Sequence, residues 1–131
     1  MSLYLHVEVG AGRYLLDARL IIEIRPELPD SGGIAHRPGG AMPAVDLHKL
    51  FDEPASPQGC CILFTQASGA AALIVDRVVG LIEFADAEFR PLPPIGPLGA
   101  MIDGVATRGG DRYPLLRLRG ERALATAVVV G

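Results

Sequence analysis

The chain has 131 residues, enough for one domain and too few for two of ordinary size. Half of its residues are hydrophobic, its formal net charge is −3, and it has no basic stripe that would favour nucleic acid as a partner. A domain of this size buries roughly two-thirds of the surface that its unfolded chain exposes, so it needs no disulfide or metal ion to fold. We therefore expect a single domain over residues 1–131.

Alternating apolar and polar residues predict strands in the first part of the chain. The period of two runs over residues 3–9, and a glycine-containing turn then leads into a return strand at 13–17. Residues 20–25 predict a third strand, which ends at a proline. Turn-forming residues predict a loop from there to Gly40.

The third strand carries two isoleucines that we expect to face the core. If Ile22 and Ile24 point inward, then Glu23 and Arg25 point outward, because side chains alternate along a strand. The core predicted for the whole chain consists of large aliphatic residues from its strands: Leu5, Val7, Ile22, Ile24, Val45, Leu63, Ile74, Val78 and Leu116.

A short strand and one helical turn are predicted in the middle of the chain. Residues 42–45 form the strand, and we expect it to lie at a sheet edge or to begin there, because Pro43 cannot donate to a ladder. Asp46 follows directly and has the right side chain to cap one helical turn that runs through Phe51.

The second half predicts further strands and hardly any helix. The charge-free stretch 54–75 contains proline, glycine and glutamine, so it predicts strands rather than a membrane span, and we expect no signal peptide at the N-terminus. Residues 123–130 fit either a helix or a strand. The other expected features are a hairpin at 60–66 and 70–75, a strand at 78–84 with a bulge at Gly80, a rigid proline-rich connection at 91–97, and a hairpin at 101–107 and 113–118. About nine or ten short strands indicate an all-β fold.

The histidines and cysteines do not have the spacing of a metal site. His6, His36 and His48 lack partners at the spacings that zinc sites use, and we expect each to be exposed or half-buried. Cys60 and Cys61 are neighbours on a predicted strand, so they point to opposite faces and are expected to be unpaired, buried thiols in a reducing cytoplasm.

Two carboxylates are candidates for chemistry. Asp46 and Asp76 each close a hydrophobic strand, which allows an acid–base pair in a cleft but more often means that a carboxylate caps a turn. No nucleophile elbow or phosphate-binding glycine loop is recognisable. The sequence therefore predicts no catalytic residue, cofactor or metal site.

Three stretches, taken in order, resemble the CheW family of chemotaxis coupling proteins. The first, residues 4–25, contains a strand, a polar turn, a tyrosine-containing strand and a Glu-Ile-Arg ending. The second, residues 33–47, leads from an arginine- and glycine-containing loop into a Pro-Ala-Val-Asp-Leu strand. The third joins 62–64 to 72–82, a strand pair that ends in Val-Asp and continues into another strand.

The resemblance implies a fold and a function. The fold is all-β, with two SH3-like five-stranded β-barrel subdomains that share a hydrophobic core. The function is that of an adaptor or scaffold without catalytic activity. Such an adaptor couples the cytoplasmic tip of a methyl-accepting chemoreceptor to the regulatory domain of a CheA-type histidine kinase. It works in the cytoplasm, reaching membrane receptor arrays through its partners and not by inserting into the membrane.

The resemblance also places a partner-binding surface, with one departure from the family. The positions that it implies lie on the third strand and the loop after it: Glu23, Arg25, Gly33, Arg37, Pro38 and Gly39. Pro38 stands where the family usually has an arginine, and proline offers neither a side-chain donor nor a backbone N–H. A divergent adaptor of a pilus-type or other chemosensory pathway, with altered receptor coupling, is therefore one alternative. A small-ligand-binding β-barrel is an alternative of another class.

Overall fold

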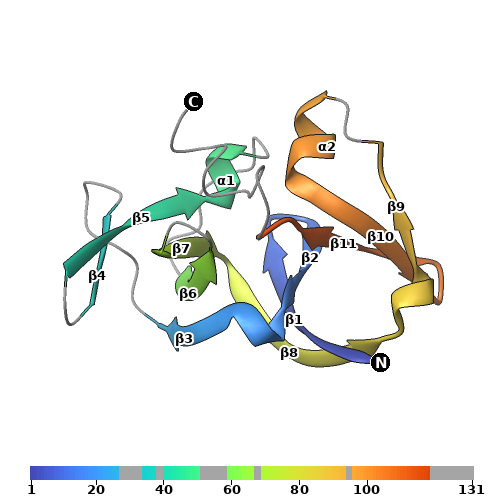
Figure 1. Ribbon diagram of the computed structural model, residues 1–131, viewed down its shortest axis with the longest axis horizontal. Coiled ribbons are helices and arrows are strands. Elements are labelled where there is room, and N and C mark those ends of the chain that lie inside the picture. Colours follow the sequence, from blue (N-terminus) through green and yellow to red (C-terminus); the bar gives the residue numbers. More distant parts are fainter. Residues whose placement is uncertain (27–33, 38–39, 51–58, 67–68, 94–95, 119–131) are drawn as a thin grey trace.

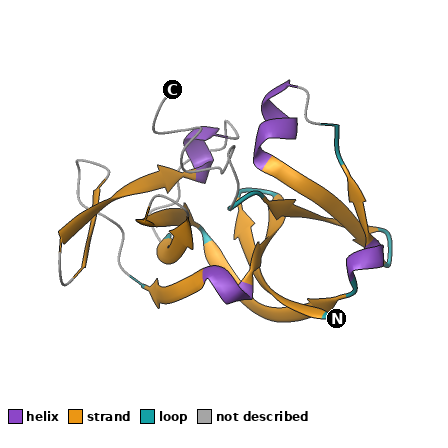
Figure 2. Cartoon of the chain, viewed as in Figure 1, coloured by secondary structure: helices purple, strands orange, loops and turns teal. Residues whose placement is uncertain are grey.

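A computed structural model describes residues 1–26, 34–37, 40–50, 59–66, 69–93 and 96–118 (Figure 1). Within these ranges the chain is built from strands with four short helical segments (Figure 2). The strands are β1 (Ser2–Val9), β2 (Gly12–Asp17), β3 (Ile21–Arg25), β4 (Ile34–Arg37), β5 (Gly40–Asp46), β6 (Cys60–Gln66), β7 (Gly69–Val75), β8 (Arg77–Phe84), β9 (Phe89–Pro91), β10 (Ile102–Arg108) and β11 (Asp111–Leu116). The helical segments are the α-helices α1 (Leu47–Leu50) and α2 (Gly96–Met101) and the 3₁₀ turns η1 (Ala18–Leu20) and η2 (Asp86–Glu88).

Six strands form a curved sheet in the order β8-β1-β2-β11-β10-β9, which curls round into a barrel in Figure 1. Neighbouring strands are antiparallel except β2 and β11, which pair in parallel at Leu15 and Leu115. Aromatic rings fill this barrel, with Tyr4, Phe84 and Phe89 in mutual contact at centroid distances of 5.2–6.3 Å. Because Tyr4 and Leu5 are both buried, β1 is covered on both faces.

The remaining strands form a five-stranded sheet in the order β3-β6-β7-β5-β4. The β6–β7 hairpin lies at its centre and confirms the predicted one. The prediction that the strand of Pro43 lies at a sheet edge or begins there was wrong, because β5 starts at Gly40 and lies between β4 and β7. Residues 40–43 pair with β4, and the parallel ladder to β7 begins only at Ala44, so Pro43 precedes that ladder.

The two sheets pack against one another around a shared hydrophobic core, which confirms the fold expected from the resemblance. The six-stranded sheet contributes Leu5, Val7, Leu16 and Leu116, and the five-stranded sheet contributes residues such as Ile62. Predicted burial of Val45 and Leu63 is also correct, whereas Ile74 and Val78 are only half-buried.

The predicted burial of Ile22 and Ile24 was wrong, since each side chain is 45% exposed. The register between β3 and β6 shifts between Ile21 and Glu23, so Ile22 is an extra residue that has no partner across the ladder. Beyond this bulge Ile24 lies opposite Ile62, but β3 is an edge strand with no neighbour on its other side. The bulge takes Ile22 out of the alternation, and the edge position leaves Ile24 exposed although it lies on the core face.

Two further segments differ from the prediction, and two features confirm it. Part of the expected loop before Gly40 is strand β4, and the proline-rich connection at 91–97 starts with the last residue of β9 and ends within α2. The bulge at Gly80 is present, because the register between β1 and β8 shifts there and Gly80 has φ 152°. The hairpin of β10 and β11 also forms as expected. Residues 123–130 lie outside the described part of the chain.

Candidate partner-binding surface

The edge strand β3 presents an exposed, mixed surface of charged and apolar side chains. Glu23 lies opposite Leu63, and Arg25 lies opposite Cys61. Both therefore project from the face of the sheet that carries the small cluster of Cys61, Leu63 and Ala72. The Arg25 Nε approaches a Glu23 carboxylate oxygen at 3.2 Å, and the Glu23 side chain is 48% exposed. The outward position expected for Glu23 agrees with this geometry, because Ile24 lies on the opposite face of the sheet, across from Ile62, although Ile24 itself is exposed.

Exposed aliphatic side chains gather on the edge strands of both sheets. In the five-stranded sheet they are Ile22 and Ile24 on β3. In the six-stranded sheet they are Val79 and Leu81 on β8, with Leu81 62% exposed. Leu3 on the neighbouring strand β1 is exposed as well. Single exposed aliphatics are ordinary, but their concentration at two edges is typical of a protein-binding surface.

Two of these residues lie on the core-facing side of their sheets. Ile24 is directly opposite Ile62, and Leu81 is directly opposite Leu5. Because directly opposed residues share one face of a sheet, Ile24 and Leu81 extend the faces of the shared core outward to the sheet edges. A partner that covers them would continue the core packing of the domain.

The remaining residues expected at this surface lie before β4, at its end, and between β4 and β5. Arg37 is the last residue of β4 and pairs with Gly40, the first of β5. Only the backbone placement of Arg37 is described, while Gly33, Pro38 and Gly39 lie outside the described residues. The structure therefore assigns Arg37 to the end of a hairpin that Figure 1 shows projecting from the body of the domain.

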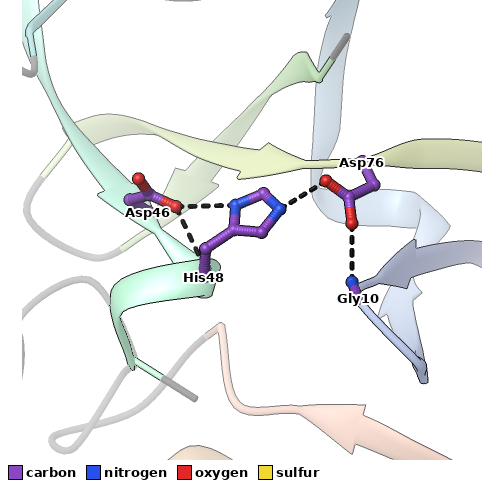
Figure 3. Close-up of polar contacts among 4 residues, drawn as sticks. All are labelled: Gly10, Asp46, His48 and Asp76. Carbon is purple, nitrogen blue, oxygen red and sulfur yellow. Dashed lines mark hydrogen bonds and ion pairs between the residues drawn. The ribbon is translucent and has the colours of Figure 1, made fainter. Parts of the chain in front are cut away.

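A second group of polar residues, which the sequence did not predict as a cluster, lies at the junction of the two sheets (Figure 3). The expectation that His48 is exposed or half-buried was wrong, because it is 2% exposed. Its Nδ1 atom lies 2.9 Å from an Asp46 carboxylate oxygen, and its Nε2 atom contacts Asp76. Asp46 also accepts the His48 backbone N–H at 3.0 Å, which confirms its expected capping role at α1.

This cluster does not have the arrangement of an acid–base catalyst. Both ring nitrogens of His48 are engaged by carboxylates, so neither can take a proton from a substrate. The nearby thiols do not provide a nucleophile either. Burial raises the pKa of both Cys60 and Cys61, which keeps them protonated and unreactive. Both are free cysteines.

The described residues include a small pocket and lack a cluster of metal-ligating side chains. One pocket beside Tyr4, Asp17 and Arg19 has a volume of about 200 Å³, which is below the roughly 300–1,000 Å³ of typical ligand sites. Within the described ranges, no group of three or more His, Cys, Asp or Glu side chains is arranged to hold a metal ion. Over the same ranges, no helix has the length and apolar character needed to cross a membrane.

Comparison with known proteins connects these features to one class of protein. The family model of the CheW-like domain matches residues 3–127. The fold is similar to the crystal structure of the scaffolding protein TtCheW from Thermoanaerobacter tengcongensis, with a TM-score of 0.73 and 23% sequence identity over 90% of each chain. No curated protein matches the sequence significantly.

The fold is an all-β domain with two sheets around one shared core. The chain belongs to the CheW-like domain family, since the family match spans nearly its whole length. Members of this family are scaffold and adaptor proteins, and an adaptor role in chemotaxis-type signal transduction is the function of this chain.

Proposed function

We propose that this adaptor couples a methyl-accepting chemoreceptor to a CheA-type histidine kinase by binding both through protein–protein contacts. The observation that carries the proposal is the family match over residues 3–127, combined with exposed apolar and charged side chains on the edge strand β3. In this proposal the chain has no enzymatic activity and works in the cytoplasm, where it joins receptor arrays through its partners.

In this proposal β3 forms the kinase-binding part of the surface. Glu23 and Arg25 provide exposed charges that select the partner and its orientation. Ile24 provides adjacent apolar area, and burying such area drives association. The regulatory domain of the kinase is the proposed partner of these residues. The following connection, with Gly33, Arg37, Pro38 and Gly39, belongs to the same partner-binding surface and meets kinase or receptor.

Direct binding measurements test the proposal. The full chain is titrated separately with the regulatory domain of a CheA-type kinase and with a soluble fragment that contains the cytoplasmic tip of a methyl-accepting chemoreceptor, using calorimetry. The proposal expects a complex with each and a ternary complex when all three are mixed. Failure to bind either partner from the native host would contradict it.

The proline at position 38 supports a second, narrower proposal, a divergent adaptor with altered receptor coupling. The family usually has an arginine there, and an interfacial arginine makes charge-assisted hydrogen bonds that proline cannot make. The variant Pro38→Arg is expected to bind the receptor tip more tightly and the kinase domain equally well. Equal receptor affinity of the wild type and the variant would show that Pro38 is a neutral replacement.

A further inference from the structure

The buried imidazole of His48 bridges two carboxylates that come from distant parts of the chain. Asp46 ends β5 and contacts Nδ1, whereas Asp76 lies between β7 and β8 and contacts Nε2 (Figure 3). The side chain of His48 is 3% exposed, while those of Asp46 and Asp76 are 24% and 20% exposed. Water therefore has little access to the ring, and its two nitrogens depend on these carboxylates for hydrogen bonds.

The number of protons on the ring follows from this geometry. A neutral imidazole has one N–H donor, so it can donate to only one of two carboxylates, while its other nitrogen lone pair would face the second carboxylate. The imidazolium has two N–H donors and can donate to both. Two ionised carboxylates placed at opposite ends of the ring therefore favour the doubly protonated, positively charged form of His48.

Asp76 is also hydrogen-bonded to the six-stranded sheet. Its Oδ2 atom accepts the backbone N–H of Gly10 at 2.6 Å, and its own backbone N–H donates to the Glu8 carbonyl at 2.9 Å. Gly10 lies between β1 and β2, so Asp76 holds the end of β1 and the turn that follows it. The chain of contacts from Asp46 through His48 to Gly10 thus connects β5 of one sheet with the β1–β2 turn of the other.

We propose that the His48 imidazolium is a proton-dependent clip between the two sheets, closed when both ring nitrogens are protonated and weakened when one proton is lost. Deprotonation leaves one carboxylate facing a ring nitrogen that no longer donates, and repulsion between these groups favours opening. The site for this switch consists of Asp46, His48, Asp76 and the Gly10 amide, and it is separate from the proposed partner-binding strand β3.

The surrounding charges raise the pKa of His48. Burial lowers the pKa of His48, but the hydrogen bonds and charges of Asp46 and Asp76 outweigh burial and raise this pKa above its ordinary value of 6.5. From β6, the Cys60 thiol is the nearby titratable group, and its own pKa is raised by burial and by Asp76. Beside Asp76, the side chains of Arg77 and Glu8 form an ion pair with each other at 2.8 Å.

The clip also holds the base of the hairpin of β4 and β5, because Asp46 is the last residue of β5 and Gly40 is its first. A dependence of partner binding on this clip would rest on the proposed function. The proton dependence of the clip does not, and it can be measured on the isolated chain.

Nitrogen-15 NMR of the histidine rings, recorded on the full chain between about pH 5 and pH 9, tests the clip directly. We expect His48 to titrate above its ordinary pKa of 6.5 and to carry protons on both ring nitrogens below that midpoint. His6 is the internal comparison, because burial in the barrel lowers its pKa. A midpoint at or below 6.5, or a ring that does not gain a second proton in the folded chain, would overturn the proposal.

Hydrogen exchange of the Gly10 amide reports the opening of the clip. Protection of this amide, corrected for the intrinsic exchange rate, should fall as the pH rises through the titration of His48. The fall should be about tenfold if the clip raises the pKa of His48 by one. In His48→Gln, protection at Gly10 should lose this pH dependence. Unchanged pH dependence in a folded His48→Gln chain would also overturn the proposal.

A pair of carboxylate variants separates the clip from general surface charge. Asp76→Asn should lower the midpoint of His48, because one of its two anionic partners is removed. Asp111→Asn is the matched control, since Asp111 is an exposed carboxylate paired with Arg13, and it should leave the midpoint unchanged. Equal shifts in the two variants would show that the whole charge of the domain acts on His48 and not the clip.

Discussion

At the scale of single residues, the position of an isoleucine within its sheet determines how much it stabilises the fold. Ile62 and Ile24 lie directly opposite one another on β6 and β3. Ile62 is fully buried in the shared core, whereas Ile24 is 45% exposed at the sheet edge. The two residues have the same side chain and lie opposite each other in one ladder. They therefore form a matched pair for measuring how burial affects the free energy of unfolding.

The variant Ile62→Ala is expected to lower the free energy of unfolding by about 2–5 kcal/mol, because it removes buried methylene groups and leaves a cavity. Ile24→Ala is expected to cost less than about 1 kcal/mol, because solvent fills the space that is vacated. Urea-induced unfolding followed by circular dichroism measures both. A cost for Ile24→Ala equal to that for Ile62→Ala would mean that the edge of β3 is covered in the isolated chain.

His6 and His48, whose pKa values are shifted in opposite directions, are expected to give the stability a maximum near pH 6.5. Burial lowers the pKa of His6, so the folded state binds fewer protons than the unfolded state, and stability rises with pH up to about 6.5. The pKa of His48 is raised, so its contribution is fully present below about 6.5 and is lost as the pH rises through its folded pKa.

Urea unfolding at a series of pH values between about 5 and 9 checks this profile. His48→Gln should remove the decline on the alkaline side and keep the slope on the acid side. His6→Gln should do the opposite. A stability that rises steadily across the whole range would contradict the raised pKa of His48.

The His48 cluster shows why residue patterns alone miss some contacts. Asp46 and His48 are two positions apart, and the sequence already indicated that Asp46 caps the turn at α1. Asp76 is 28 positions from His48. No local pattern joins them, because their proximity results from the parallel pairing of β5 with β7, which ends at Asp46 opposite Ile74.

At the scale of secondary structure, local pairings were predictable and distant ones were not. The hairpins of β6 with β7 and of β10 with β11 have short turns, so strand pattern and turn residues lie in one window of sequence. Strands β4 and β9 have four and three residues. Such short strands carry almost no periodic signal, and their pairing with β5 and β10 defines them.

The turn between β10 and β11 is expected to tolerate asparagine but not valine at its first glycine. Gly109 and Gly110 have φ of 61° and 85°, which is the left-handed region, and no atom lies within 4 Å of the position of a Gly109 Cβ. Any cost of substitution is therefore conformational and not a clash. Gly109→Val should destabilise by about 1–2 kcal/mol or more, and Gly109→Asn by a few tenths of that, because asparagine adopts this conformation readily in hairpin turns.

Thermal unfolding of the two variants measures this difference, with the wild type as reference. Both substitutions add side-chain atoms at the same exposed position, so each serves as the size control for the other. Equal melting temperatures for Gly109→Val and Gly109→Asn would show that the turn relaxes to another backbone conformation.

At the scale of the whole molecule, the shared core explains why the family pattern was recognisable from sequence. Both sheets contribute to one cluster, so apolar residues must recur at matched positions along almost the entire chain. The order of strands and turns then becomes specific even though each motif alone is common. The partner-binding surface is less predictable, because exposed side chains are free of these packing constraints.

Charge reversal at Glu23 tests the proposed surface in the assembled complex. Glu23 is exposed and pairs with Arg25, and an exposed ion pair contributes less than about 1 kcal/mol to stability. Glu23→Arg should therefore leave the melting temperature nearly unchanged. At an interface, by contrast, placing like charges together costs several kcal/mol, so the Kd for the kinase regulatory domain should rise at least about tenfold.

The matched control for this reversal is Glu83→Arg, which changes an exposed glutamate on β8, the edge strand of the other sheet. Both variants alter the net charge of the chain equally, so a general electrostatic effect would weaken binding equally in both. Calorimetric titration of the kinase domain at low and moderate salt separates the two cases. Selective loss of affinity in Glu23→Arg assigns β3 to the kinase interface, and wild-type affinity in that variant would place the interface elsewhere on the domain.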